Sequence, residues 1–231
     1  GFSTADQLKV AAHDGAAQAL QALLDMGSAL HQAGFSTADL VKVAAHHGGQ
    51  QALQALLDKG PALRQAGFST ADLLKVAAHH GGAPALQALL DTGPALRQAG
   101  FSAADLVKVA AHDGAAQALR ALLDKGLALR QAGFSTADLL KVAAHIGGAP
   151  ALQALLDRGP ALRQAGFSTA DLVRIAGTGG GRKTMETLLQ THRRLAGGGV
   201  SRDQMLVLAT KPRGASGALQ SKADEIASAG R

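Results

Sequence analysis

The sequence predicts an all-α protein, a superhelical α-solenoid of 33-residue helix-loop-helix repeats. Apolar residues fall at helical spacing, and glycines interrupt the helical runs at the same places in every period. A fixed period of this length is typical of stacked two-helix repeats. The period is marked by the phenylalanines, which stand at Phe2, Phe35, Phe68, Phe101, Phe134 and Phe167.

The first helix of each repeat is predicted to begin at a capping box. In the repeat 68–100, Ser69 is followed three residues later by Asp72, ahead of an apolar run. Gly81 and Gly82 are expected to end this helix and form the loop to the next one. The residues expected to be buried in the first helix are Leu73, Leu74, Val76 and Ala77.

The second helix of the same repeat is predicted to contain Pro84 in its first turn, where proline is tolerated. The run Asp91-Thr92-Gly93-Pro94 is expected to break or kink this helix, and Leu96 continues its apolar face toward the next phenylalanine. The residues expected to be buried are Ala85, Leu86, Leu89 and Leu90.

A single two-helix unit cannot bury its apolar faces alone, so neighbouring repeats must stack. The sixth repeat, 167–199, is divergent, and 200–231 keeps only the outline of a repeat, as a degenerate C-terminal capping repeat would. Gly1 matches the last position of a repeat, so the chain is expected to be a piece of a longer array. Residues 1–166 hold five regular repeats, 2–34, 35–67, 68–100, 101–133 and 134–166.

Composition disfavours several classes of protein. The chain has no cysteine, which removes disulfide scaffolds and thiolate metal sites. No apolar run approaches the roughly 18 residues of a membrane-spanning helix, and the N-terminus lacks a signal-like pattern. We therefore expect a soluble monomer with no cofactor, no small-molecule substrate and no membrane partner.

Catalytic and metal sites are also disfavoured. The serines, histidines and aspartates recur as periodic positions, so a nucleophile, a base and an orienting group would not converge, and an enzyme is not expected. Histidines at a 33-residue period would be spread along the solenoid, whereas zinc needs three or four ligands in one cluster. The stretch GTGGGRKT, residues 177–184, is nearly a phosphate-binding P-loop. It has Arg182 where that motif needs glycine and follows a predicted helix, so we interpret it as the sixth repeat loop.

Variation among the repeats is concentrated at one loop position. Most positions hardly change from copy to copy, as the stacking of identical interfaces requires. The side chain at the thirteenth position is acidic in some copies, and aromatic or aliphatic in others. Packing explains such a change poorly, so we predict that this position recognises a ligand. The twelfth position is His13, His46, His79, His112, His145 and Thr178, and the thirteenth is Asp14, His47, His80, Asp113, Ile146 and Gly179.

The repeat resembles that of the transcription-activator-like effector (TALE) family. With its 33-residue length and Phe-Ser start, it is most similar to the Burkholderia TALE-like (Bat-type) branch. The similarity is residue for residue over 2–166, looser over 167–199 and faint over 200–231. It implies binding to double-stranded DNA, with each loop in the major groove reading one base of one strand. It also implies that the twelfth-position residues brace the loop against their own first helix.

The resemblance places the thirteenth-position side chains against bases. Asp14 and Asp113 should prefer cytosine, because its exocyclic amine is a donor and a carboxylate only accepts. Gly179 leaves room for the thymine methyl group. For His47 and His80 a purine preference is implied, guanine first, while Ile146 is left unassigned. The implied site, read 5′ to 3′, is C, G or A, G or A, C, unassigned, T.

The loop glycines are expected to let the backbone approach phosphates. TALE repeats usually follow this glycine pair with lysine and glutamine, whereas here only Arg182 and Lys183 are basic. Loops with Ala16 and Ala115 in place of the second glycine are candidates for a different tilt. The phosphate-proximal glycines are Gly15, Gly48, Gly49, Gly81, Gly82, Gly114, Gly147, Gly148, Gly180 and Gly181.

Charge is concentrated near the C-terminus. Residues 1–180 hold 14 Lys and Arg against 13 Asp and Glu, and residues 181–231 hold 9 against 4. Uniform electrostatic wrapping of DNA is therefore not predicted. A Lys or Arg recurs once in each first helix, and could either line a groove wall or belong to a solvated helix face. The basic region expected to contact phosphates, or else to keep a cap soluble, contains Arg182, Lys183, Arg193, Arg194, Arg202, Lys211 and Arg213.

The main alternative is a protein-binding α-solenoid scaffold. Its recognition residues would vary along helix faces, and these hardly vary here. RNA binding is a third option, disfavoured because aromatic stacking groups are missing. Six repeats span about six base pairs, so this chain alone is expected to bind DNA weakly. A bacterial source is implied, while delivery into a host cell nucleus and a role in transcription stay open.

Overall fold

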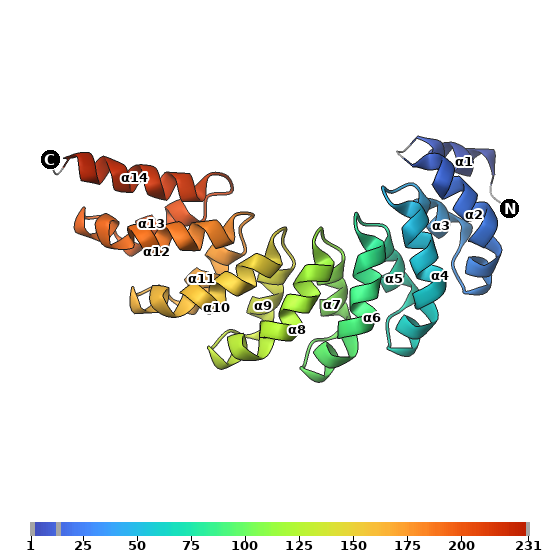
Figure 1. The fold of residues 1–231 in the computed structure, drawn as a ribbon, viewed down its shortest axis with the longest axis horizontal. Helices are drawn as coiled ribbons and strands as arrows, with labels where there is room; N and C mark the ends of the chain where they lie inside the picture. Colours follow the sequence, from blue (N-terminus) through green and yellow to red (C-terminus); the bar gives the residue numbers. More distant parts are fainter. Residues whose placement is uncertain (1–2, 13–14, 230–231) are drawn as a thin grey trace. The chain divides into compact units, whose positions relative to one another are not determined.

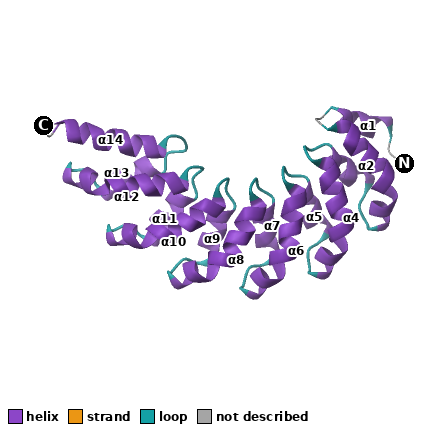
Figure 2. Ribbon diagram, viewed as in Figure 1, coloured by secondary structure: helices purple, strands orange, loops and turns teal. Residues whose placement is uncertain are grey.

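The structure of the protein is a computed structural model, which describes residues 3–12 and 15–229. Within these residues every regular element is an α-helix, so the prediction of an all-α fold is confirmed (Figure 2). Short helices of 8 residues alternate with long helices that mostly have 17. Each 33-residue repeat contributes one helix of each kind, which is the architecture of an α-solenoid.

The chain divides into two compact units, residues 1–120 and 121–231, and the boundary falls inside α8 (Ala115–Gln131). In the first unit, long helices pack on long helices and short helices on short ones, and α1, α3 and α5 each also pack on the long helix of their own repeat (Figure 1). Its other helices are α1 (Thr4–Ala11), α2 (Ala16–Gln32), α3 (Thr37–Ala44), α4 (Gly49–Gln65), α5 (Thr70–Ala77), α6 (Gly82–Gln98) and α7 (Ala103–Ala110).

The second unit repeats this packing as far as the last helix. Its long helices α10, α12 and α14 stack in sequence, and so do its short helices α9, α11 and α13. The bounds are α9 (Thr136–Ala143), α10 (Gly148–Gln164), α11 (Thr169–Ala176), α12 (Gly181–Gly197), α13 (Arg202–Ala209) and α14 (Ala215–Ala229).

Every short helix begins at a capping box, as the sequence predicts. At α5, Ser69 Oγ accepts a hydrogen bond from the Asp72 N–H at 3.1 Å, and the Asp72 carboxylate accepts one from the Ser69 N–H at 2.9 Å. Such a cap contributes about 1 kcal/mol to helix stability. The same arrangement begins α1, α3, α7, α9 and α11, and in α13 Gln204 takes the place of the aspartate.

The predicted apolar stripes form the core of the repeat, with one half-buried leucine in each helix. The half-buried residues are Leu74 in α5 and Leu90 in α6. The other predicted residues are buried, namely Leu73, Val76 and Ala77 in α5 and Ala85, Leu86 and Leu89 in α6.

The long helix does not break at its proline. The sequence predicts a break or a kink at the run that ends in Pro94. Helix α6 runs through it to Gln98, so the expectation of a break is wrong, and the kink stays a prediction. Proline has no N–H and leaves the carbonyl of Leu90 without its helical partner. Leu96, two residues further on, is buried, and its burial outweighs the loss of one backbone hydrogen bond.

An arginine near the end of α6 and of α10 links two repeats, a contact that the sequence analysis missed. The guanidinium of Arg163 lies over the ring of Phe134, 5.5 Å from its centroid, and donates a hydrogen bond to the Ala132 carbonyl of the preceding repeat. The recurrence of arginine at this position is the signal that could have revealed it. Parts of the same arrangement recur where Arg64 lies over Phe35 and Arg97 donates to Ala66.

The first repeat shows which apolar residues depend on a preceding neighbour. Leu8 and Val41 occupy the same position in successive repeats, but Leu8 is 67% exposed and Val41 is 4% exposed. Helix α3, which carries Val41, packs on α1 of the preceding repeat. Burial at this position therefore comes from stacking between repeats and not from within one repeat.

We expect Val41→Ala to lower the free energy of unfolding by about 1–3 kcal/mol, because it removes buried methyl groups and leaves a cavity. Leu8→Ala, which removes more atoms from an exposed side chain, should change it by less than about 0.5 kcal/mol. Urea denaturation followed by circular dichroism measures both. Equal losses in the two variants would contradict the role of stacking.

Candidate nucleic-acid interface

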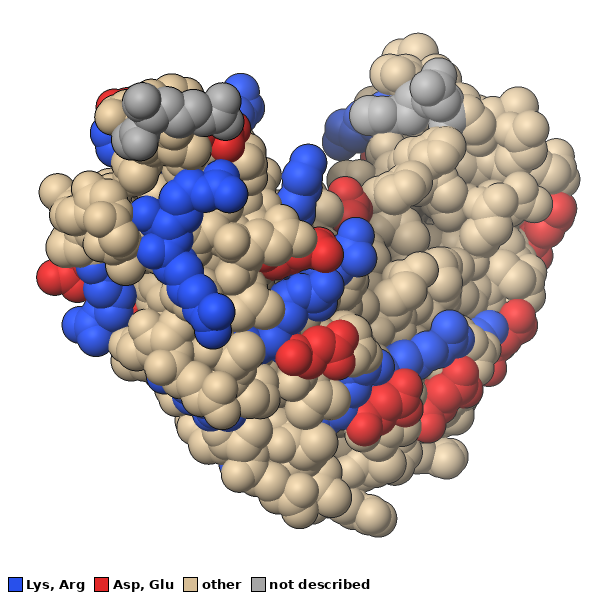
Figure 3. All heavy atoms as spheres, turned by 60° about the vertical axis from the view of Figure 1, so that its left-hand side comes forward, with Lys and Arg blue, Asp and Glu red and all other residues tan. Residues whose placement is uncertain are grey.

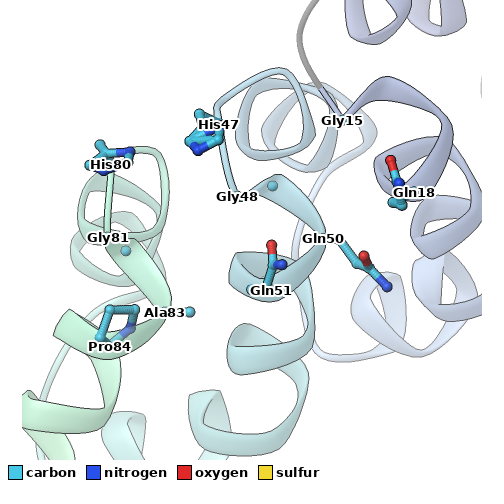
Figure 4. Close-up of a pocket in the computed structure, with 12 residues that line it drawn as sticks. Gly15, Gln18, His47, Gly48, Gln50, Gln51, His80, Gly81, Ala83 and Pro84 are labelled. Carbon is cyan, nitrogen blue, oxygen red and sulfur yellow. The ribbon is translucent and has the colours of Figure 1, made fainter.

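A glycine in the left-handed conformation reverses the chain between the two helices of each regular repeat, whereas Gly180 in the divergent sixth repeat has φ of −124°. The value of φ is +81° at Gly48, +77° at Gly81, +78° at Gly114 and +81° at Gly147. A side chain at this position would strain the backbone, so glycine is needed there. The reversal leaves the thirteenth residue at the tip of the loop, as Figure 4 shows for His47 and His80.

The second loop glycine is held against the protein itself. A Cβ atom at Gly82 would lie 2.5 Å from the Ala77 carbonyl oxygen at the end of the short helix. Gly49, Gly148 and Gly181 are in the same position, and all four residues are buried. Close approach of two helix ends thus favours glycine in these four repeats, and contact of these glycines with phosphate stays a prediction.

The repeat with Ala115 at this position accommodates the extra methyl group. Ala115 is buried, and the last residue before its loop, Ala111, has ψ of 29°, compared with 7° at Ala78 in the preceding repeat. Ala12, which precedes the loop with Ala16, has ψ of −1°, so the two alanine loops do not share this change and a different tilt stays a prediction.

Gly82→Ala should lower the free energy of unfolding by about 1–3 kcal/mol, because the new methyl group overlaps the Ala77 carbonyl. Gly217→Ala is the matched control. Gly217 lies in α14 with nothing within 4 Å of its Cβ position, so alanine should stabilise that helix slightly. Thermal denaturation of the two variants distinguishes the cases, and a stable Gly82→Ala protein would rule out the close contact.

The described thirteenth-position residues are all exposed at loop tips. Ile146, for example, is 68% exposed, so its side chain has no part in the core. The rings of His47 and His80 stack on one another, with centroids 5.2 Å apart and planes 15° apart. Asp14 and its neighbour His13 lie outside the described residues. The exposed set is His47, His80, Asp113, Ile146 and Gly179.

The twelfth-position residues differ in how they meet the first helix. Thr178 Oγ1 donates a hydrogen bond to the Ile175 carbonyl at 2.8 Å, which ties this loop to the end of α11. The histidines His46, His79, His112 and His145 are exposed residues, and bracing by their rings stays a prediction.

The pKa of His79 lies below the ordinary value of 6.5 for histidine. The main cause is partial burial of the ring, which disfavours the cation. The positive charges of His112, His46 and Lys75 act in the same direction, whereas Asp113 opposes them. The surroundings of His79 therefore favour its neutral form over its cation.

Acidification should destabilise the first unit through this residue. Because the folded-state pKa is depressed, the contribution of His79 is complete above about pH 6.5 and is lost as the pH falls through the folded-state pKa. We expect the urea midpoint to fall less between about pH 7.5 and about pH 5 in His79→Asn than in the unsubstituted protein. His192→Asn, on α12, is the control, and an unchanged pH response in His79→Asn would contradict the assignment.

A groove of about 480 Å³ lies along the loops of the first three repeats (Figure 4). It is lined by loop glycines, by His47 and His80, and by the first residues of the long helices. Helix N-termini have unsatisfied backbone N–H groups that suit anions. Besides these histidines, the polar side chains in the described lining are Gln18, Gln50 and Gln51. The described lining contains no Lys or Arg, which agrees with the lack of loop lysines in the sequence.

The cations of the second unit are partly engaged within the protein. Arg202 Nη1 donates to the Gly166 carbonyl at 3.0 Å, and Arg194 lies 3.6 Å from Asp224. The other cations of the basic region are exposed, namely Arg182, Lys183, Arg193, Lys211 and Arg213. Figure 3 shows basic and acidic side chains beside one another on part of the drawn face, most of which is neither basic nor acidic. A Lys or Arg recurs in each short helix, and both interpretations of it, a groove wall and a solvated helix face, stay predictions. One of these residues, Lys108, lies 3.9 Å from Asp105.

Other kinds of site find little support within the part of the chain that the structure describes. There, no three His, Cys, Asp or Glu side chains come together as a metal site would need, and no helix is long and apolar enough to cross a membrane. Residues 177–184 follow the helix α11, not a strand, and lead into α12, so their interpretation as the sixth repeat loop is confirmed. A comparison of the chain with models of known protein families finds no match, and a comparison with curated proteins finds none either.

Proposed function

We propose that the protein binds double-stranded DNA in a sequence-specific manner, as a TALE-like array in which each repeat reads one base. The observation that carries this proposal is the thirteenth position. Its side chain varies among otherwise uniform repeats, and in every described copy it is exposed at the tip of a loop. A residue that is free of packing and differs from loop to loop suits readout of a ligand that differs from step to step.

The chemistry of the loop tips fits the edges of base pairs in the major groove. Asp113 offers only acceptors, which match the exocyclic amine of cytosine. His47 and His80 can donate to purine N7, and Gly179 leaves space for a thymine methyl group. Each tip differs in donors, acceptors or volume, the properties by which base pairs are distinguished in this groove.

Electrostatics limits the expected affinity. The first 180 residues are nearly neutral, so few condensed cations would be released from DNA on binding. The exposed cations of the second unit, including Arg182 and Lys183 at the start of α12, would supply most phosphate contacts. Binding should therefore weaken with salt less steeply than for a uniformly basic DNA-binding protein.

Asp113→Asn tests the readout. The unsubstituted protein should prefer cytosine over thymine at the fourth base by roughly fivefold, about 1 kcal/mol, because one carboxylate acceptor gives the lower end of base discrimination. An amide can also donate, so the variant should lose most of this preference. Fluorescence anisotropy with duplexes that differ at this base measures it.

Asp124→Asn is the matched control, since it removes the same charge from the same repeat at an exposed position on α8. It should keep the cytosine preference. Binding that depends only on salt and not on sequence would assign DNA binding to the basic region alone. Absence of binding would favour a protein-binding scaffold.

A further inference from the structure

Two successive loop tips touch each other in the first unit. The His47 and His80 rings are nearly parallel, at 15°, and their centroids are 5.2 Å apart. Both residues are exposed and project from the loops above the glycine-lined groove (Figure 4). The two side chains expected to read neighbouring bases are therefore in contact before any DNA is bound.

Stacking restricts both rings. An exposed histidine side chain on a loop turns about two torsions, whereas rings with centroids 4.5–7 Å apart attract one another in an offset stack. Hydrogen bonds to imidazole nitrogens are made in the plane of the ring, so stacking of the faces leaves these nitrogens available. The contact thus orients the rings without occupying the atoms that would meet a base.

The spacing of the rings suits two neighbouring base pairs. Successive base pairs rise about 3.4 Å along a strand, so rings that face two consecutive steps remain close enough to stay in contact. Adenine and guanine both present N7 as an acceptor in the major groove, and guanine adds O6. Each ring can donate to one such acceptor while the other ring supports it.

We propose that His47 and His80 act as one reading element, which recognises two successive purines on the same strand and whose two positions are not independent. This inference rests on the proposed DNA binding. It predicts that the preference at the His47 step depends on what occupies position 80. Asp113, which has no ring to stack, should read its own step alone.

His80→Ala and His80→Phe separate stacking from hydrogen bonding. Both remove the ring nitrogens at position 80, but phenylalanine keeps an aromatic face for His47. We expect His80→Ala to reduce the purine preference at the His47 step by about threefold or more, and His80→Phe to retain it. Anisotropy titrations with purine or pyrimidine at this step, on an otherwise constant duplex, measure the preference.

The free protein provides a second readout. In proton NMR spectra without DNA, the ring signals of His47 should shift in His80→Ala, because the ring current of the neighbour is lost. They should not shift in His145→Ala, which alters a loop histidine in the second unit. Unchanged His47 signals in His80→Ala would show that the rings do not stack and would overturn the proposal.

The binding outcomes distinguish this proposal from the one on which it rests. If cytosine is preferred at the Asp113 step, DNA readout stands. The reading element is then overturned by any of three results: no purine preference at the His47 step, the same preference in all three proteins, or equal loss in both variants. If cytosine is not preferred either, the proposed function fails together with this inference.

Discussion

The tight reversal between the two helices of a repeat is the constraint on which the rest of the structure depends. It needs one glycine with positive φ, such as Gly81, and then close contact between Gly82 and the end of the preceding short helix. Because this reversal is the same in most repeats, the short and long helices keep one relative orientation, and their apolar faces can stack on identical neighbours. A residue with a side chain at the position of Gly81 would strain the loop, because φ there is positive.

Because of this constraint, the residues that stabilise a repeat are different from the residue at the tip of its loop. The groups that hold a repeat together are the capping boxes, the buried leucines and the arginine that bridges to the preceding repeat, and these lie along the helices and at their ends. The thirteenth residue contributes little to them because it is exposed at the tip of the loop. Its identity can therefore change from repeat to repeat without a penalty in folding, which is the property that a modular reader of DNA would need.

Neighbouring loop tips are not fully independent of one another, because some of them are in contact. Where both tips carry rings, as at His47 and His80, the side chains meet and orient one another. On the proposed function, specificity would then belong partly to pairs of repeats. The near-neutral charge of the first 180 residues makes such short-range contacts more important, because few long-range attractions to phosphate are available to supply affinity.

The sequence alone determined the all-α repeat fold, the capping boxes and the buried stripes, because each depends on residue spacing within one repeat. It also singled out the thirteenth position, because internal copies can be compared directly. Only the tertiary structure decided whether α6 continues through Pro94, since that depends on burial of Leu96 beyond the proline. Likewise, the bridging arginines, the tight packing of Gly82 and the stacking of His47 on His80 join atoms that adjacent repeats or helices bring together. Their distances depend on how those elements pack, which residue spacing does not specify.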